Sequence, residues 1–193
     1  MNRHLFIHVI PARLRRGVVL GAVAGLALGF ARAEAPRYDE NQVKAAYLFN
    51  FTRFVEWPTN SFAEAETPLI IGILGDDPFR EALEKTVRGE KVKGHPLAVR
   101  SSRKIEDLKS CHVIFVDKTQ KPQMQQILAT LRDCPVLTVG EIDGFAQRGG
   151  IINMIKQEKR IGFEINNEAA RRQGIKIGSQ LTELGTCVKD DSP

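Results

Sequence analysis

Three short and almost continuous apolar runs stand out along the chain, at Pro68–Gly75, Cys111–Asp117 and Cys134–Glu141. Runs of this length are typical of strands that are buried on both faces of a sheet. Between them, "DDPFREALEKTV" predicts a helix capped by Asp77, and "KPQMQQILATLRD" predicts an amphipathic helix. Strands that alternate with helices predict a mainly parallel central sheet flanked by helices on both faces.

The pattern changes in the last third of the chain. Ile151–Ile155 and Ile161–Ile165 read as two strands that the polar turn "KQEKR" joins into a C-terminal β-hairpin. A short helix over "NNEAARRQG" then begins at Asn166 or Asn167 and ends at Gly174. The fold class is therefore α/β, with one or two further short strands in "EKVKGHPLAVRSS" and short helices in "KIEDLKS" and "KIGSQLTELG".

An aromatic-rich segment, "KAAYLFNFTRFVEWP" at residues 44–58, precedes the first strand. Its spacing predicts a helix from about Glu40 to Glu56 that ends before Pro58. One face of this helix, with Tyr47, Phe51 and Phe54, is suited to cover the sheet. Trp57 at the helix end is either part of the core or an exposed contact residue.

The first 33 residues predict a secretory signal peptide. Arg3, Arg13, Arg15 and Arg16 precede the apolar run "VVLGAVAGLALGF", and "ARA" ends the segment at Ala33. Thirteen apolar residues are too few to span a bilayer, although an uncleaved anchor is the alternative. We therefore expect a periplasmic protein, cleaved near Ala33, with residues 34–193 forming one domain.

Removal of this segment changes the charge of the protein. The whole chain carries 28 Lys and Arg against 23 Asp and Glu, a net charge of +5. The signal peptide holds five of the bases and none of the acids, so 23 of each remain and the net charge is zero. No basic stripe is left for phosphate contacts, so we expect no nucleic-acid partner.

Catalytic and metal-binding patterns are missing from the sequence of the mature chain. Only His95 and His112 remain, without the cysteine or acid cluster that a zinc site needs. There is no G-x-S-x-G or C-x-x-C motif, and Asp76 and Asp77 follow the glycines of "GILGDDP", where a phosphate would have to bind. We expect no enzyme, no cofactor and no metal.

A small-ligand sensor is the alternative function. Open parallel sheets bind ligands at the carboxyl ends of their strands. The loops at Gly75–Asp77, Asp117–Lys118 and Gly140–Glu141 lie at such ends, although ordinary turn chemistry is the favoured explanation for them.

The three cysteines allow one intramolecular disulfide at most. Cys111 and Cys134 each come just before a predicted strand, so adjacent parallel strands would place them at the same end of the sheet. We expect a Cys111–Cys134 bridge, with two free buried thiols as the alternative. Cys187 is then free or forms an intermolecular bond, or it replaces one of the two partners.

The order of several segments resembles the YfiR family. These segments are "KAAYLFNFTRFVEWP", "PLIIGILGDDPF", "GEKVKGHPLAVR", "CHVIFV", "PVLTVGEIDGFAQRGGIINM" and "RIGFEINNEAARRQGIKIGSQL". The resemblance implies a periplasmic, non-catalytic protein that binds and represses an inner-membrane diguanylate cyclase, which lowers cyclic di-GMP and restrains biofilm formation. It also implies an outer-membrane lipoprotein partner that relieves repression, and two redox-linked disulfides, for which three cysteines do not suffice.

Two surfaces are candidates for partner binding. Trp57 with the nearby Arg53 has the composition of an interface anchor. The corner at Phe163, Glu164 and Asn166 is the second candidate, and its alternative is a solvated corner with a capping asparagine. We also expect a homodimer to be possible through a strand edge in "GGIINM".

Overall fold

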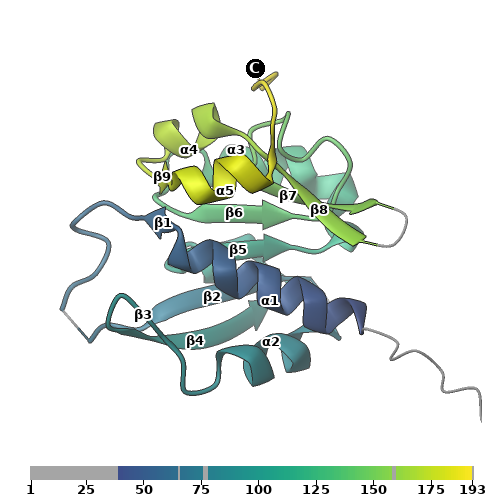
Figure 1. Ribbon diagram of the computed structural model, residues 1–193. Helices are drawn as coiled ribbons and strands as arrows, with labels where there is room; N and C mark the ends of the chain where they lie inside the picture. The colour runs from purple at the N-terminus through teal and green to yellow at the C-terminus, as the bar shows by residue number, and fades with distance from the viewer. Residues whose placement is uncertain (1–38, 65, 76–77, 158–159, 193) are drawn as a thin grey trace, which may run out of the picture. The chain divides into compact units, whose positions relative to one another are not determined.

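A mixed eight-stranded sheet runs through the middle of the fold (Figure 1). The computed structural model describes residues 39–64, 66–75, 78–157 and 160–192. Within them the sheet order is β10-β8-β7-β6-β5-β2-β4-β3, and β1 pairs separately with β9. The strands are β1 (Val55–Glu56), β2 (Leu69–Leu74), β3 (Lys91–Val92), β4 (His95–Ser102), β5 (Val113–Val116), β6 (Leu137–Gly140), β7 (Ile152–Gln157), β8 (Arg160–Ile165), β9 (Lys176–Ile177) and β10 (Thr186–Cys187).

Five neighbouring strands, from β4 across β2, β5 and β6 to β7, run parallel. The strands β7 and β8 form an antiparallel hairpin, and β10 runs parallel to β8. The predicted fold class is therefore confirmed: a mainly parallel sheet flanked by helices, with a C-terminal hairpin.

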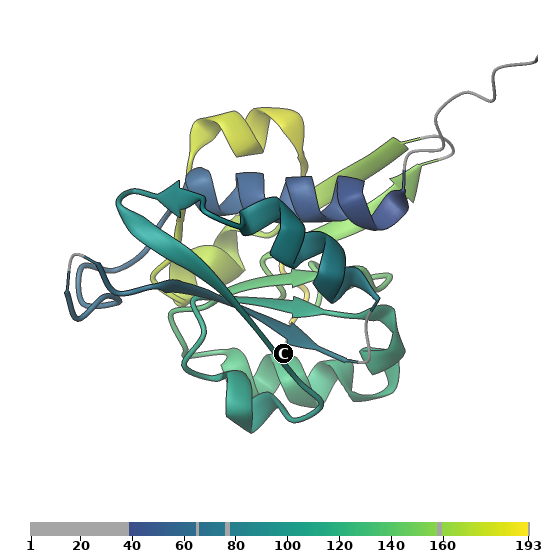
Figure 2. The same ribbon diagram turned by 90° about the horizontal axis from the view of Figure 1, so that it is seen from below.

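Helices cover both faces of this sheet (Figure 2). Helices α1 and α2 lie on one face, and η1 and α3 lie on the other. The helical segments are α1 (Glu40–Arg53), α2 (Phe79–Val87), α3 (Met124–Leu131), α4 (Asn167–Arg172), α5 (Ser179–Leu184) and the 3-10 turns η1 (Ile105–Leu108) and η2 (Lys118–Gln123).

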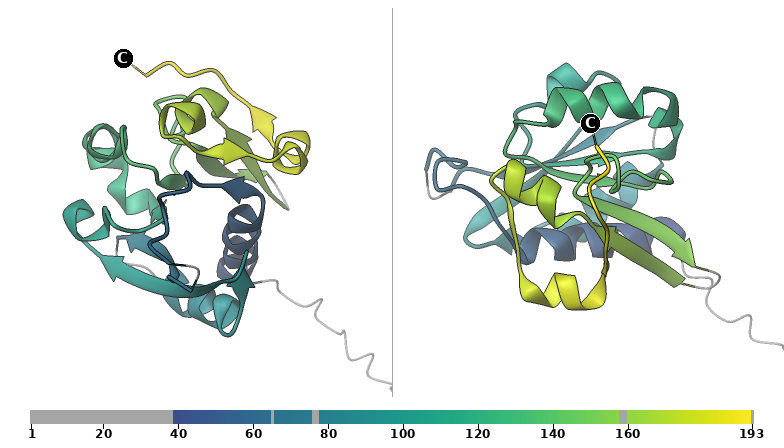
Figure 3. Two further views of the ribbon diagram at one scale, coloured as in Figure 1. Left: turned by 90° about the vertical axis from the view of Figure 1, so that its left-hand side faces the viewer. Right: turned by 90° about the horizontal axis from the view of Figure 1, so that it is seen from above.

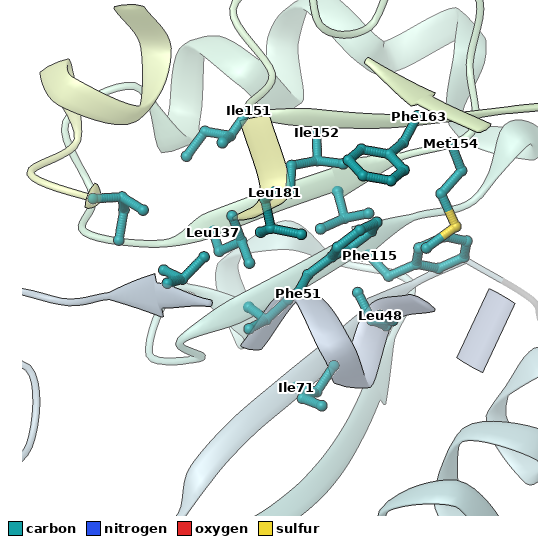
Figure 4. Packing of buried hydrophobic residues seen from close by; sticks show 14 of the residues in the cluster. Leu48, Phe51, Ile71, Phe115, Leu137, Ile151, Ile152, Met154, Phe163 and Leu181 are labelled. Carbon is teal, nitrogen blue, oxygen red and sulfur yellow. The ribbon is translucent and has the colours of Figure 1, made fainter. Parts of the chain in front are cut away.

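The aromatic segment supplies the centre of the larger core (Figure 4). Leu48 and Phe51 of α1 are buried against Phe163 of β8, and the rings of Phe51 and Phe163 meet edge to face at 5.0 Å. Tyr47 joins them at 6.0 Å from each ring. Because these side chains come from both ends of the chain, the core ties α1 to the C-terminal hairpin.

The predicted first helix is correct except at its end. Helix α1 ends at Arg53, because Val55 and Glu56 turn away to pair with β9. The short strand β1 therefore replaces the last helical residues that the sequence predicted.

The predicted dimer edge in "GGIINM" is wrong. Ile152 and Asn153 pair with β6 on one side and β8 on the other, so this segment lies inside the sheet. Two predictions, the signal peptide over residues 1–33 and the helix cap at Asp77, lie outside the described residues.

Candidate functional site

The end of α1 presents an exposed arginine on an aromatic ring. Arg53 is exposed, and its guanidinium carbon lies 5.9 Å from the ring centre of the half-buried Phe49. This distance is in the range of a cation–π contact, which holds the charged group over the ring while leaving it open to solvent. Because α1 runs from the carboxyl ends of the strands to their amino ends, Arg53 stands at the amino edge of the sheet, which faces the viewer in Figure 3, left.

Trp57 anchors the segment that follows, between β1 and β2. Its indole N–H donates a 3.1 Å hydrogen bond to the carbonyl of His112, directly before β5. The ring of Phe62, in the same segment, is stacked between two imidazoles, with centroids 3.9 Å from His95 and 4.4 Å from His112. Trp57 meets Phe62 edge to face at 6.1 Å. We call Trp57, Phe62, His95 and His112 the aromatic–histidine cluster.

Hydrogen bonds fix the protonation of His112 within this cluster. The backbone N–H of Ile70 donates to Nδ1 at 3.1 Å, so Nδ1 carries no proton and Nε2 donates to the carbonyl of Ser61 at 3.1 Å. Burial lowers the pKa of His112, and the nearby His95 lowers it further, although the bond to Ser61 opposes the shift. The neutral imidazole is therefore the form that this site stabilises.

A pH-dependent loss of stability follows from this arrangement. Since the folded pKa of His112 lies below its ordinary value of 6.5, the unfolded chain binds more protons once the pH falls below that value. We expect the contribution of His112 to the free energy of unfolding to be highest above about pH 7 and to fall between pH 7 and 5, with a slope of at most about 1.4 kcal/mol per pH unit from one histidine.

Denaturant unfolding at several pH values measures this loss. The His112→Asn variant keeps an acceptor near the amide of Ile70 but does not titrate, so its stability should depend less on pH over the same range. An equal slope in the variant and the parent protein would contradict the role assigned to His112.

A cavity of about 320 Å³ opens beside the aromatic–histidine cluster. Trp57, Phe62 and His95 supply aromatic walls, and Glu56 and Lys93 supply opposite charges at its border. Aromatic walls with a charged border are typical of sites that receive a side chain of a protein partner.

The second predicted surface, at the end of β8, is mostly interior. Phe163 is 6% exposed, and Asn166 is fully buried. The side chain of Asn166 accepts a bond from the amide of Ala169 and donates one to the carbonyl of Ala146 at 2.7 Å, so it caps α4. Because Phe163 and Asn166 present almost no side-chain surface to solvent, we assign them to the core rather than to a partner surface.

Glu164 is half-buried and also bonded within the chain. Its two carboxylate oxygens accept hydrogen bonds from Gln147 and from the buried Asn153, at 3.2 and 3.1 Å. These bonds link β8 to β7 and to the loop after β6, so removal of Glu164 would leave two amide donors without their partner.

An ion-pair network occupies the opposite edge, where the carboxyl ends of the strands meet α1. Lys44 is only 8% exposed, and its ammonium lies 2.5 Å from Glu141 and 2.9 Å from Glu40. Hydrogen bonds from Lys156 and Lys44 lower the pKa of Glu40 to about 2. Burial raises the pKa of Glu141; Lys44 opposes this rise, and a hydrogen bond with Asp117 adds to it. Protein side chains thus fill part of the edge at which the sequence suggested a ligand.

The cysteines are free thiols in the structure. Val113 pairs with Leu137, which places Cys111 level with Pro135 and one position away from Cys134. Cys111 packs against Gly72, where burial raises the pKa of its thiol, while Cys134 donates to the carbonyl of Thr130. The predicted Cys111–Cys134 bridge is not formed here; for the oxidised protein it stays a prediction that a non-reducing peptide map tests.

Sequence reasoning did not identify the aromatic–histidine cluster. The signal was present, because His95 opens β4 and His112 immediately precedes β5, and parallel neighbours of β2 bring their amino ends together. Within the described part of the chain, no group of three or more His, Cys, Asp or Glu is placed to hold a metal ion. Within the same residues, no helix is both long and apolar enough to cross a membrane.

A family model described as YfiR/HmsC-like matches residues 41–186. A comparison with curated proteins found no match. One similar solved structure is a conserved domain protein from Vibrio cholerae O1 biovar El Tor, with 14% identity over 76% of this chain and 60% of that chain, and a TM-score of 0.53.

A second similar structure is the ABC domain in complex with L-Trp from Streptococcus pneumoniae, with 10% identity over 77% of this chain and 62% of that chain, and a TM-score of 0.50. This chain therefore spans only about three fifths of the length of either solved structure. At such low identity the two likenesses show a shared fold alone.

Proposed function

The chain belongs to the YfiR/HmsC-like family, and from this we propose that it binds and represses an inner-membrane diguanylate cyclase from the periplasmic side. The family is regulatory and periplasmic, and it acts on diguanylate cyclases in general. Repression lowers cyclic di-GMP and restrains biofilm formation, and an outer-membrane lipoprotein relieves it. Residues 1–33 serve as the signal peptide that brings residues 34–193 to this compartment.

The surface that we assign to the cyclase lies at the amino edge of the sheet. It combines the exposed Arg53, the half-buried rings of Phe49 and Trp57, and the cavity beside Trp57. Arginine and tryptophan are the residue types most enriched among interface residues that dominate binding energy. The bond from Trp57 to the carbonyl of His112 fixes the indole before the partner arrives, which reduces the entropy lost on binding.

The buried corner at the end of β8 supports the fold of this regulator rather than its contact with the cyclase. Phe163 packs on Phe51 of α1, the helix that carries Arg53, so the corner positions the contact surface through the core. Glu164 and Asn166 hold the corner together through their hydrogen bonds.

Spheroplasts of a strain that lacks the gene test this function, because they expose the periplasmic side of the inner membrane. Purified mature protein, added from outside, should lower the synthesis of cyclic di-GMP several-fold in a dose-dependent manner. Unchanged synthesis at micromolar protein, in spheroplasts whose cyclase remains active, would contradict the proposal. Heat-unfolded protein is the matched control.

A further inference from the structure

A second cavity, of about 580 Å³, is lined by α3, the loop after β6, the end of α4 and the C-terminal segment. Figure 3, right, shows these segments. Leu128 and Ala129 give it an apolar wall. Its charged lining is Arg132, Arg148, Arg172 and Asp191, three bases against one acid. A volume of this size is typical of small-molecule sites.

Two of these arginines have guanidinium groups that are open to solvent and available to a ligand. Arg132 and Arg148 are both exposed, and neither forms an ion pair with any residue that the structure describes. Arg172 differs, because its guanidinium lies 2.7 Å from the carboxylate of Asp190, which is 5% exposed. The two free guanidinium groups make the cavity electropositive, and each can bind a carboxylate or phosphate through two parallel hydrogen bonds.

The guanidinium groups of Arg148 and Arg172 lie near two glycines of the loop after β6. A Cβ atom on Gly144 would stand 3.7 Å from the guanidinium carbon of Arg148, and one on Gly149 would stand 3.5 Å from a guanidinium nitrogen of Arg172. Both glycines adopt positive φ values, +76° and +102°, which L side chains rarely adopt. The positive φ values shape the loop that forms one side of the cavity, and both guanidinium groups lie within ordinary contact range of this loop.

The C-terminal segment forms the other side and is fixed in place. The amide of Val188 donates to the carbonyl of Ile165 at 2.9 Å, and the amide of Asp191 donates to the carbonyl of Gln147 at 2.7 Å. Burial alone would raise the pKa of Asp190, but hydrogen bonds from Ser192 and Arg172 outweigh burial and lower it. Asp190 therefore stays ionised and keeps Arg172 paired, while Arg132 and Arg148 stay available.

We propose that this cavity binds a small organic anion, whose carboxylate or phosphate group lies between Arg132 and Arg148 and whose apolar part packs on Leu128 and Ala129. The positive charges of Arg132 and Arg148 favour an anionic ligand. The cavity volume is larger than inorganic phosphate needs, so the ligand has an organic part as well. The proposal does not depend on the cyclase surface, because Trp57, Phe62 and His95 line a different cavity.

Thermal unfolding of the mature protein tests this site with two probes, succinate and glycerol 3-phosphate, each at 10 mM against sodium chloride of equal ionic strength. A probe present at ten times its Kd should raise Tm by roughly 3–5 °C. A shift with succinate alone indicates a carboxylate ligand, and a shift with glycerol 3-phosphate alone indicates a phosphate ester. Either result supports the site.

The double variant Arg132→Gln/Arg148→Gln should abolish the shift, and isothermal titration calorimetry should show at least a tenfold weaker affinity. Arg160→Gln, which removes an exposed arginine from β8, is the matched control and should keep the shift. Anions also stabilise proteins without a site. An equal shift in the double variant, or no shift with either probe, would overturn the proposal.

Discussion

Reversal of the charge at Arg53 should abolish repression while leaving the protein folded. In the Arg53→Glu variant we expect affinity for the periplasmic part of the cyclase to fall by about 30-fold or more, the loss typical of an interface residue worth ~2 kcal/mol. Cellular cyclic di-GMP should then approach the level of the deletion strain. The side chain is exposed and its guanidinium lies over the ring of Phe49, so we expect a small effect on the core.

Two matched variants separate binding from stability in this experiment. Arg160→Glu reverses an exposed arginine on β8 and should repress normally. Arg53→Lys keeps the charge and should retain part of the repression, although lysine lacks the planar group that stacks on Phe49. Full repression by Arg53→Glu, with a circular dichroism spectrum like that of the parent protein, would place the contact surface elsewhere.

A single added methyl group at Gly150 should destabilise the whole domain. Phe145 is fully buried between two glycines, and a Cβ atom on Gly140 would stand 2.6 Å from its ring. A Cβ atom on Gly150 would overlap the ring even more closely. Because a packed core cannot move aside, we expect Gly150→Ala to lower the free energy of unfolding by about 3 kcal/mol and Tm by roughly 10 °C.

A double-mutant cycle identifies the clash as the cause. Phe145→Leu makes room beside Gly150, so the methyl group should cost much less in that background than in the parent protein. Gly89→Ala is the control, because no atom lies within 4 Å of its Cβ position and only its φ of +76° opposes the change, at about 1 kcal/mol. Equal losses in both backgrounds would show that Phe145 is not the obstacle.

The sequence predicted most of the sheet because its strands carry strong local signals. The runs in β2, β5 and β6 are apolar at nearly every position, as burial on both faces requires, and Asn166 and Gly174 mark the ends of α4 with ordinary capping chemistry. The resemblance to the YfiR family, carried by these same segments, is confirmed by the family match.

Features that depend on contacts between distant segments were not predictable in this way. Phe62 meets His112 across 50 positions of the chain, and Lys44 meets Glu141 across 97. The two-residue strand β10 has no periodicity, and only its pairing with β8 defines it. The corner residues Phe163 and Asn166 looked exposed because their strand ends there, whereas the loop after β6 and the helix α1 cover them.

Cellular cyclic di-GMP tests the central claim most directly. It is measured in the parent strain, in a deletion strain, and in the deletion strain carrying the gene either with its first 33 residues or without them. We predict a several-fold rise on deletion that only the form with these residues reverses, because the proposed repression requires export to the periplasm. An unchanged level on deletion, in a strain with an active periplasm-facing cyclase, would contradict the claim, and so would equal reversal by both forms.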